Sequence, residues 1–453
     1  MSSWAGLRVI FAAAAALVAS LAAAAPAAAV TIVSVKSESG VEAWLVEDHS
    51  LPLVAIRFSF ESGAALDPPG KEGLANFAAS LLDEGAGDLD SEAYNARLED
   101  LSIRLEFGAD MDATGGTMRT LSRNTDAAFE LLHLSLTRPR FDAAAVERVR
   151  EQLVAELQQV AKEPPTIGSR IFWHSAFPEH PYGRRTRGTI ASLGRIEAAD
   201  LRQFAAERFG RDRLKIGVVG DVTPERLRTL LDRTFGDLPA KSAPGTVAET
   251  KVIDEGALFL VKVPVPQSAV IFGEAGLKRD DPDWYAAILL NEILGGSGMT
   301  SRLTAEVRDK RGLAYSIYSQ LDAMRRAGMI VGRVATRNDR VAETIDLVRS
   351  EWQRMRDEGP TEAELAAAKT YTIGSFAPSF DSTDSMASLL VGMQIQKLGM
   401  DYPSRRASLL EKVTLEDVRR VARRLLDAQK LRIVVVGDPP PLAGAREMQP
   451  DGG

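Results

Sequence analysis

The chain has 453 residues, of which 45% are hydrophobic and 26% charged, and its formal net charge is −7. This length predicts two or three domains, and the composition is typical of a globular protein that folds without disulfides or a structural metal. The acidic balance argues against a nucleic-acid-binding protein. The absence of cysteine excludes disulfides, thiolate zinc sites and a cysteine nucleophile.

Residues 1–29 have the pattern of a secretory signal sequence. Arg8 gives a positive start, residues 9–21 are apolar and rich in alanine, and small residues precede a cleavage site after Ala29. A retained membrane anchor is the alternative, because residues 9–30 are long enough to span a bilayer. The small-residue pattern favours cleavage. We therefore expect an exported, periplasmic protein without a membrane segment after cleavage.

Two stretches of the chain repeat one pattern. Residues 196–221 and 413–438 align without a gap, and each is an amphipathic helical pattern followed by a β-rich run that stops at Gly-Asp. Upstream, the turns at residues 67–69 and 280–282 each follow a predicted strand and precede a predicted helix. We infer an internal duplication of one α/β unit.

The four histidines are His49, His133, His174 and His180. Catalytic zinc usually has three protein ligands. His174 and His180 are six residues apart with a proline between them, and this spacing does not put both on one helical face. We expect structural roles for the histidines and no metal held by this chain.

Residues 299–319 predict a charged helix, a Gly-Leu-Ala turn and an aromatic strand. Arg308 and Tyr315 stand seven residues apart across this junction. Each has an ordinary explanation by itself, since most helix charges are only solvated and most strand tyrosines pack in a core or at an edge. The segment nevertheless closely resembles the Arg/Tyr signature in the C-terminal half of pitrilysin/insulinase-family zinc peptidases, such as mitochondrial processing peptidase.

This resemblance extends over nearly all of residues 30–438 and implies the fold. The family has an α/β (α+β) architecture in which two homologous domains, each a mixed sheet plus helices, form one half of a clamshell. The predicted divisions are a signal peptide, a first peptidase-like domain, a linker rich in Pro, Ala, Ser and Gly, a second peptidase-like domain with the Arg/Tyr motif, and a disordered tail. Their bounds are 1–29, 30–238, 239–250, 251–440 and 441–453.

The zinc motif of the family is degenerate here. The motif H-x-x-E-H supplies two histidine ligands and a glutamate base from one helix. The register of residues 67–85 places Asn76, Ala79 and Ser80 at these positions. The third family ligand is a downstream Glu, for which Glu156 is the nearest match and Glu151 an alternative. Since a lone carboxylate makes no zinc site, Glu156 also fits an ordinary solvated helix residue.

In the two-subunit branch of the family, one subunit carries H-x-x-E-H and the other the Arg/Tyr pair. The resemblance implies that Arg308 and Tyr315 bind the substrate near the scissile bond, where guanidinium and phenol can donate to the oxyanion. We therefore expect a non-catalytic, substrate-binding subunit of an exported heterodimeric zinc peptidase that acts on peptides. Alone the chain would be inactive, and Zn would belong to the homologous H-x-x-E-H partner.

Two other functions remain open at this point. The chain could be a scaffold protein of the same fold without protease function, or a periplasmic peptide-binding module. Whether it forms a homodimer without its partner is also open.

Overall fold

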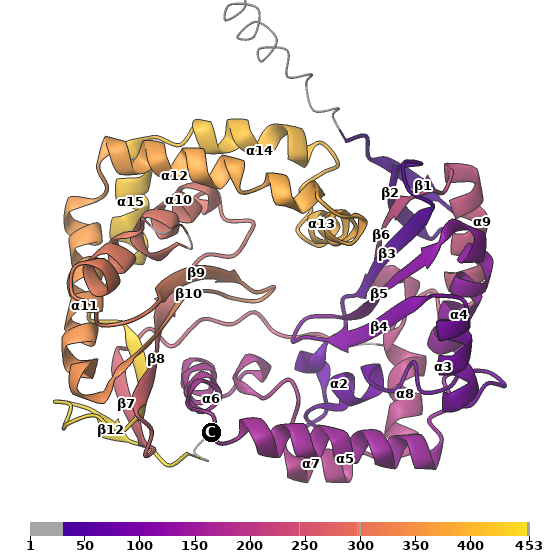
Figure 1. The fold of residues 1–453 in the computed structure, drawn as a ribbon, viewed down its shortest axis with the longest axis horizontal. Helices are drawn as coiled ribbons and strands as arrows, with labels where there is room; N and C mark the ends of the chain where they lie inside the picture. The colour runs from indigo at the N-terminus through magenta and orange to yellow at the C-terminus, as the bar shows by residue number, and fades with distance from the viewer. Residues whose placement is uncertain (1–29, 244, 297, 299, 451–453) are drawn as a thin grey trace, which may run out of the picture.

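The computed structural model describes residues 30–450 except 244, 297 and 299, and it consists of two α/β halves that lie side by side (Figure 1). The predicted signal peptide, residues 1–29, lies outside the described residues. Among the described residues, no helix combines the length and the apolar character needed to cross a membrane.

The first half is built on a sheet of six strands in the order β1-β2-β6-β3-β5-β4. Its strands are β1 (Val33–Lys36), β2 (Glu42–Glu47), β3 (Leu53–Phe60), β4 (Arg104–Ala109), β5 (Thr114–Leu121) and β6 (Leu214–Gly220). Its α-helices are α2 (Leu74–Ala79), α3 (Ser91–Asp100), α4 (Thr125–Thr137), α5 (Ala143–Val160), α6 (Pro164–Ala176), α7 (Ile190–Arg195), α8 (Ala198–Arg208) and α9 (Pro224–Phe235).

The second half is built on another six-stranded sheet, in the order β12-β7-β11-β8-β10-β9. Its strands are β7 (Ala257–Lys262), β8 (Gln267–Ala275), β9 (Ile317–Ala323), β10 (Gly328–Arg337), β11 (Arg432–Gly437) and β12 (Arg446–Glu447). Its α-helices are α10 (Trp284–Gly295), α11 (Val341–Glu358), α12 (Glu362–Gly374), α13 (Thr383–Ile395), α14 (Tyr402–Glu411) and α15 (Leu415–Leu425).

The two sheets have equivalent strand orders. Strands β2, β6, β3, β5 and β4 occupy the places of β7, β11, β8, β10 and β9. In the first half, β6 runs parallel to β2 and antiparallel to β3. In the second half, β11 runs parallel to β7 and antiparallel to β8 in the same way. The predicted duplication and the mixed-sheet α/β fold are therefore confirmed.

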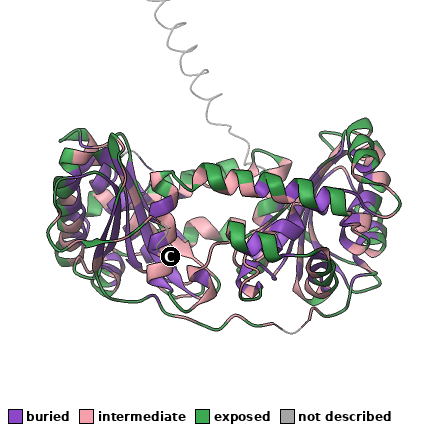
Figure 2. Ribbon diagram, turned by 90° about the horizontal axis from the view of Figure 1, so that it is seen from below, coloured by how far each residue is buried: buried purple, intermediate pink, exposed green. Residues whose placement is uncertain are grey.

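The central strands read as continuous apolar runs because both of their faces are covered. Every residue of β11 is buried, and β6 is buried except for one half-buried lysine. Figure 2 shows this distribution, with buried residues concentrated in the strands and exposed residues on the outer helices.

The two halves exchange one helix each. Helix α6 of the first half packs on β8 and β11, and α13 of the second half packs on β3 and β6 (Figure 1). Gly217 of β6 makes room for α13, since a Cβ there would lie 2.5 Å from the Ala387 carbonyl oxygen. Gly168 of α6 is less confined, because its nearest neighbour would be a Val436 methyl at 3.4 Å. Each sheet is thus completed by a segment from the other half of the sequence.

The prediction of a disordered tail is wrong for part of residues 441–453. Strand β12 pairs in parallel with β7, and the Met448 amide donates to the Leu260 carbonyl oxygen at 2.8 Å. The reason is that β7 would otherwise be an edge strand with unpaired backbone groups, which the tail satisfies. Residues 451–453 lie outside the described part of the chain.

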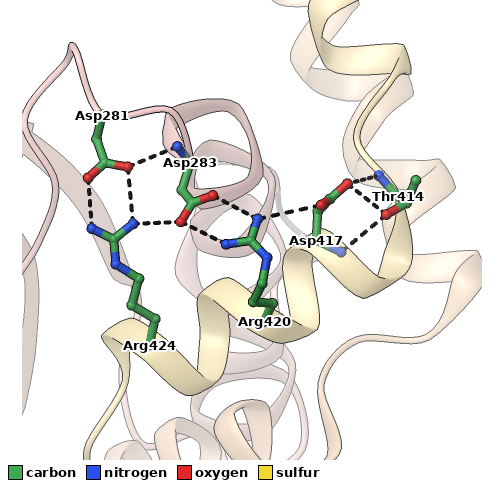
Figure 3. Close-up of polar contacts among 6 residues, drawn as sticks. All are labelled: Asp281, Asp283, Thr414, Asp417, Arg420 and Arg424. Carbon is green, nitrogen blue, oxygen red and sulfur yellow. Dashed lines mark hydrogen bonds and ion pairs between the residues drawn. The ribbon is translucent and has the colours of Figure 1, made fainter.

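The turn before α10 is fastened to α15 by a network of ion pairs (Figure 3). Both terminal nitrogens of Arg420 donate to Asp283, at 2.9 and 2.7 Å. Arg424 reaches Asp281 at 2.8 Å and Asp283 at 2.5 Å. Asp417 accepts from Arg420 and also closes a capping box at the start of α15. The network therefore holds the entry of α10 against the helix beside it.

Candidate functional site

Helix α2 carries the three positions at which the resemblance predicts a degenerate metal motif. Asn76 and Ser80 are half-buried on one side of the helix, and the Ser80 hydroxyl donates to the Asn76 carbonyl oxygen at 3.0 Å. Ala79 is buried in the core of the first half. These side chains provide neither an imidazole ligand nor a carboxylate base, so α2 lacks the groups needed for metal-assisted hydrolysis.

Glu156 lies on α5 and is engaged with polar neighbours. One carboxylate oxygen accepts from Gln152 at 3.3 Å, and the other lies 3.8 Å from an Arg187 guanidinium nitrogen. Glu151, the alternative, is exposed on the same helix. In the part of the chain that the structure describes, no three His, Cys, Asp or Glu side chains are grouped so that they could hold a metal ion.

Two of the histidines show how these residues are used. His180 holds its loop in place, since one ring nitrogen lies 3.1 Å from the Ala248 carbonyl oxygen and the other accepts from the Tyr182 amide at 3.2 Å. Burial lowers the pKa of His180. His49 is exposed, and its hydrogen bond to Asp221 raises its pKa. Each of these two histidines thus binds a residue far along the chain, Asp221 for His49 and Ala248 for His180.

The structure brings Arg308 and Tyr315 together. Arg308 lies in a π-helix, η5 (Thr304–Asp309), and its guanidinium carbon is 5.8 Å from the centre of the Tyr315 ring. This is the geometry of a cation–π contact. Tyr315 comes before β9 rather than starting a strand as the sequence suggested, and it is 90% exposed.

The π-helix is held by its own backbone and by a buried carboxylate. The Lys310 amide donates to the Ala305 carbonyl oxygen at 3.0 Å, five residues back. Glu306 is buried between the cations of Lys310 and Arg311, each at 2.6 Å, and these hydrogen bonds lower its pKa to about 2. The turn then passes through Gly312 with φ at +60°. Single π-helical turns are rare and often occur at functional sites.

The Arg/Tyr pair and the degenerate metal positions belong to different halves of the molecule. The π-helix η5 packs against β9 and α11, whereas α2 packs against α8 and β4. In Figure 1, β9 and α11 lie in the left half and α2 lies in the right half. Arg308 and Tyr315 thus lie in one half, and the helix that lacks metal-binding side chains lies in the other.

Sequence reasoning missed a cavity of about 1040 Å³ between the halves. The tips of the β4–β5 and β9–β10 hairpins form part of its wall, the first acidic with Asp110 and Asp112 and the second basic with Arg325 and Arg326. The Arg325 amide donates to Asp112 at 3.0 Å, and the Tyr182 hydroxyl donates to Asp112 at 2.6 Å. Opposite charge at corresponding positions of the duplicated hairpins was the signal available in the sequence.

Comparison with known proteins identifies the family. The model described as Insulinase (Peptidase family M16) matches residues 43–190, and the model described as Peptidase M16 inactive domain matches residues 195–371. The chain belongs to the M16 peptidase family. The first match contains α2, and the second contains Arg308 and Tyr315.

Individual relatives agree with this assignment. The chain is 24% identical over 394 residues to the non-peptidase homolog YmxG of Helicobacter pylori, covering 86% of this chain and 90% of that protein. It is 22% identical to the mitochondrial-processing peptidase subunit beta of Lentinula edodes, covering 83% and 84%. These relatives and the missing ligands support a non-catalytic member of the M16 family.

Solved structures resemble the fold along most of its length. The peptidase M16 inactive domain from Pseudomonas fluorescens superposes with a TM-score of 0.84 at 26% identity, covering 92% of this chain and all of that one. The periplasmic protease PqqL from Escherichia coli shares the fold, with a TM-score of 0.75 at 17% identity. The match covers 92% of this chain but 47% of PqqL, so this chain corresponds in fold to about half of that protein.

Proposed function

We propose that this chain is the substrate-binding, non-catalytic subunit of an exported two-subunit zinc peptidase. It gives Arg308 and Tyr315 to the active site of a homologous partner that carries H-x-x-E-H. The observation that carries the proposal is the stacked pair itself, with the guanidinium 5.8 Å from the ring centre and the tyrosine 90% exposed. Buried tyrosines usually serve packing, whereas this ring lies in water with its hydroxyl free to meet another molecule.

The chemistry suits a pair that acts on another subunit's substrate. Peptide hydrolysis places negative charge on the oxygen of the scissile carbonyl, and preorganised donors stabilise that charge. The Tyr315 hydroxyl and the Arg308 guanidinium are both donors, and their stacking fixes them relative to each other. Neither needs a metal of its own. The zinc of the partner would activate the attacking water.

The size of the chain and the names of its relatives support a two-subunit arrangement. PqqL is described as one periplasmic protease, and this chain corresponds in fold to about half of it. The Lentinula edodes relative is named as a subunit of a peptidase. If two clamshell halves enclose the site, the substrates are peptides or short unfolded segments, because a closed chamber does not admit a folded protein.

The proposal includes export by the predicted signal peptide, residues 1–29. Sequencing the N-terminus of the protein recovered from the periplasmic fraction should give Val30 as the first residue. Recovery of the full-length chain in the membrane fraction would instead identify the segment as a retained anchor.

The central test combines this chain with an H-x-x-E-H homologue encoded in the same genome. Hydrolysis of a fluorogenic peptide library should require both proteins and should be abolished by a chelator. In the mixture, Tyr315→Phe and Arg308→Ala should each lower the rate about 10²-fold to 10³-fold, the usual effect of removing one oxyanion donor.

Matched controls separate this role from a structural one. Tyr318→Phe alters a second tyrosine, which lies in β9 and is 37% exposed, and Arg340→Ala alters an exposed arginine of the same half. Both should leave the rate unchanged. Chelator-sensitive hydrolysis by this chain alone, or full activity of the Arg308 and Tyr315 variants in an assembled complex, would refute the proposal.

A further inference from the structure

The cavity between the halves carries an excess of positive charge. Nine Lys and Arg residues line it against six Asp and Glu residues, so the balance favours an anionic ligand. Its volume of about 1040 Å³ lies at the upper end of the range of about 300–1,000 Å³ for ligand pockets, which also tend to lie between domains. Apolar side chains at Met111, Trp173, Met324 and Ile395 share the lining.

Part of the charge is already neutralised. Glu249 pairs with Lys278 at 3.1 Å and with Arg326 at 2.9 Å. Glu61 pairs with Arg325. The pair of Glu61 with Arg325 joins the two halves, and the pairs of Glu249 join the linker to the second half. The charges of these three cations are therefore already balanced.

Other cations at the cavity have no carboxylate partner among the described residues, namely Arg184, Lys215, Arg279 and Lys397. Arg279 is held in position, because its Nε donates to the Gln396 side chain at 3.1 Å and its guanidinium carbon lies 5.1 Å from the Trp284 ring centre. A guanidinium fixed by neutral neighbours keeps its full charge and loses little conformational freedom when it binds an anion.

The internal duplication gives Lys215 a counterpart in the second half, and the contacts of that counterpart show what a cation at this place can bind. Lys215 is the second residue of the β6 run, and Arg432 has the equivalent place at β11. Arg432 is buried and donates to the carbonyl oxygens of Ile253 at 3.3 Å and Glu255 at 3.1 Å. The loop that supplies them runs past the end of α6, where the Ile253 amide donates to the Ala176 carbonyl oxygen. In the second half, therefore, the backbone of a loop, residues 253–255, occupies the place beside this cation.

In the first half, the equivalent place opens into the cavity. The end of α13 takes the role of α6 here, and the Gln394 side chain donates to the Ile216 carbonyl oxygen at 2.7 Å, next to Lys215. Two residues further on, Gln396 holds Arg279. Within the described residues, no carbonyl or carboxylate oxygen accepts a hydrogen bond from Lys215. The two cations thus flank the end of one helix.

We propose that this cavity binds the C-terminal end of an extended peptide, with the terminal carboxylate between Lys215 and Arg279. The peptide backbone would contact the Lys215 side chain as the backbone of residues 253–255 contacts Arg432, and its side chains would meet Trp173 and the other apolar groups of the lining. The inference goes beyond the proposed function, because this site lies wholly within one chain and needs no partner subunit.

The test measures binding to the mature chain alone, residues 30–453, by titration calorimetry. The probe is the peptide acetyl-Ala-Ala-Leu-Ala with a free C-terminal carboxylate, compared with the same peptide as a C-terminal amide. The free acid should bind at least about tenfold more tightly than the amide, because a charge-assisted contact is lost in the amide. Tryptophan fluorescence should change on saturation, and the change should be smaller in Trp173→Phe, which keeps Trp284 beside Arg279.

Variants of the chain test whether the C-terminal carboxylate of the peptide binds at Lys215. Lys215→Met keeps the aliphatic stem, so the fold should survive, and it should weaken binding of the acid about tenfold without affecting the amide. Lys412→Met, at an exposed position outside the cavity, should match the unaltered chain. No saturable binding, equal affinity for acid and amide, or equal effects of the two variants would overturn the proposal. None of these outcomes bears on Arg308 and Tyr315, since no partner is present.

Discussion

The two halves share one strand order but stabilise the turn before their first core helix in opposite ways. In the first half, Asp67 is 5% exposed and accepts backbone hydrogen bonds from Gly73 at 2.9 Å and Ala75 at 3.1 Å. In the second half, Asp281 and Asp283 are half-buried and bind two arginines of α15 (Figure 3). One turn uses the main chain of its own helix, and the other uses side chains of a neighbouring helix.

The ion pairs between the turn and the neighbouring helix also have opposite charge arrangements in the two halves. In the first half the cation is on the turn and the anion is on the helix, as Lys71 binds Asp200 of α8 at 2.5 Å. In the second half the anions are on the turn and the cations, Arg420 and Arg424, are on α15. Duplication has therefore kept the backbone path, while the charges that secure it have diverged.

The difference gives the halves opposite responses to acid. Burial raises the pKa of Asp67 from 3.8 to about 7, so its contribution to the free energy of unfolding falls as pH rises between these values. Hydrogen bonds from Arg424 and Arg420 lower the pKa of Asp281 and Asp283, respectively. Their contribution is present above the ordinary pKa of 3.8 and is lost as pH falls below it. Acid therefore favours the first turn and weakens the second.

The largest effect is expected where an exchanged helix meets its sheet. Gly217→Val should reduce the free energy of unfolding by about 3 kcal/mol, because a side chain there would overlap the Ala387 carbonyl oxygen of α13. Urea unfolding followed by circular dichroism measures the change. Gly168→Ala at the other exchanged helix is the control and should stay within about 1 kcal/mol, since its Cβ has 3.4 Å of clearance. A similar loss in both would mean that the two contacts are equally tight.

A second prediction isolates the buried carboxyl of the first turn. Asp67→Asn should remove the pH dependence that Asp67 causes. Between pH 4 and pH 7 the unaltered chain should lose about 3 kcal/mol of unfolding free energy relative to the variant. Melting temperatures across this range measure the difference. Asp381→Asn, at an exposed position, should leave the profile unchanged. Parallel profiles for the unaltered chain and Asp67→Asn would show that Asp67 does not bind a proton on folding.

The third prediction breaks the network of the second turn. Arg424→Ala should cost about 1–2 kcal/mol, because Asp281 and Asp283 are half-buried and would lose a charged partner. The loss should shrink at pH 3, where the carboxylates of the unfolded chain are protonated. Arg423→Ala is the matched control on the same helix, and its ion pair to Glu416 is exposed, so it should cost less than about 0.5 kcal/mol. If Arg424→Ala and Arg423→Ala lowered the free energy of unfolding equally, the network would stabilise the protein no more than an ordinary surface ion pair does.

The smallest effect is expected at the reversed link of the first half. Lys71→Ala should cost about 0.5 kcal/mol, since the lysine is partly exposed and the turn keeps its backbone hydrogen bonds to Asp67. Chemical denaturation at low and high salt measures it, and salt should diminish it further. If Lys71→Ala lowered the free energy of unfolding as much as Arg424→Ala, both turns would depend equally on their ion pairs.

The sequence predicted the parts of the fold that depend on local pattern. The apolar runs at β6 and β11 and the acidic turns before α2 and α10 repeat visibly, so the duplication and the mixed sheets followed from them. The helix exchange did not, because the fit of α13 on β6 depends on Gly217 and on residues far along the chain. The ordered tail was missed for a similar reason, since the free edge of β7 that receives it is a property of the assembled sheet.

The candidate site likewise has one part that the sequence predicted and one part that it did not. Spacing within a single motif directed attention to Arg308 and Tyr315, and the structure places one over the other. Their proposed role in a partner's active site remains a prediction. The cavity between the halves is built by hairpin tips whose contact joins Asp112 to Arg325, 213 residues away. The opposite charges of the two hairpin tips are visible in the sequence, but no local pattern shows that the tips meet.

The exchange of α6 and α13 has a consequence for how the chain is made. A ribosome delivers the first half well before α13, so during synthesis the α13-facing side of β3 and β6 has no cover. Apolar surface left open in this way invites aggregation or a chaperone. A fragment that ends before Thr383 should therefore be poorly soluble even though it contains every strand of the first sheet. We therefore expect the first sheet to be fully covered only after α13 has been synthesised.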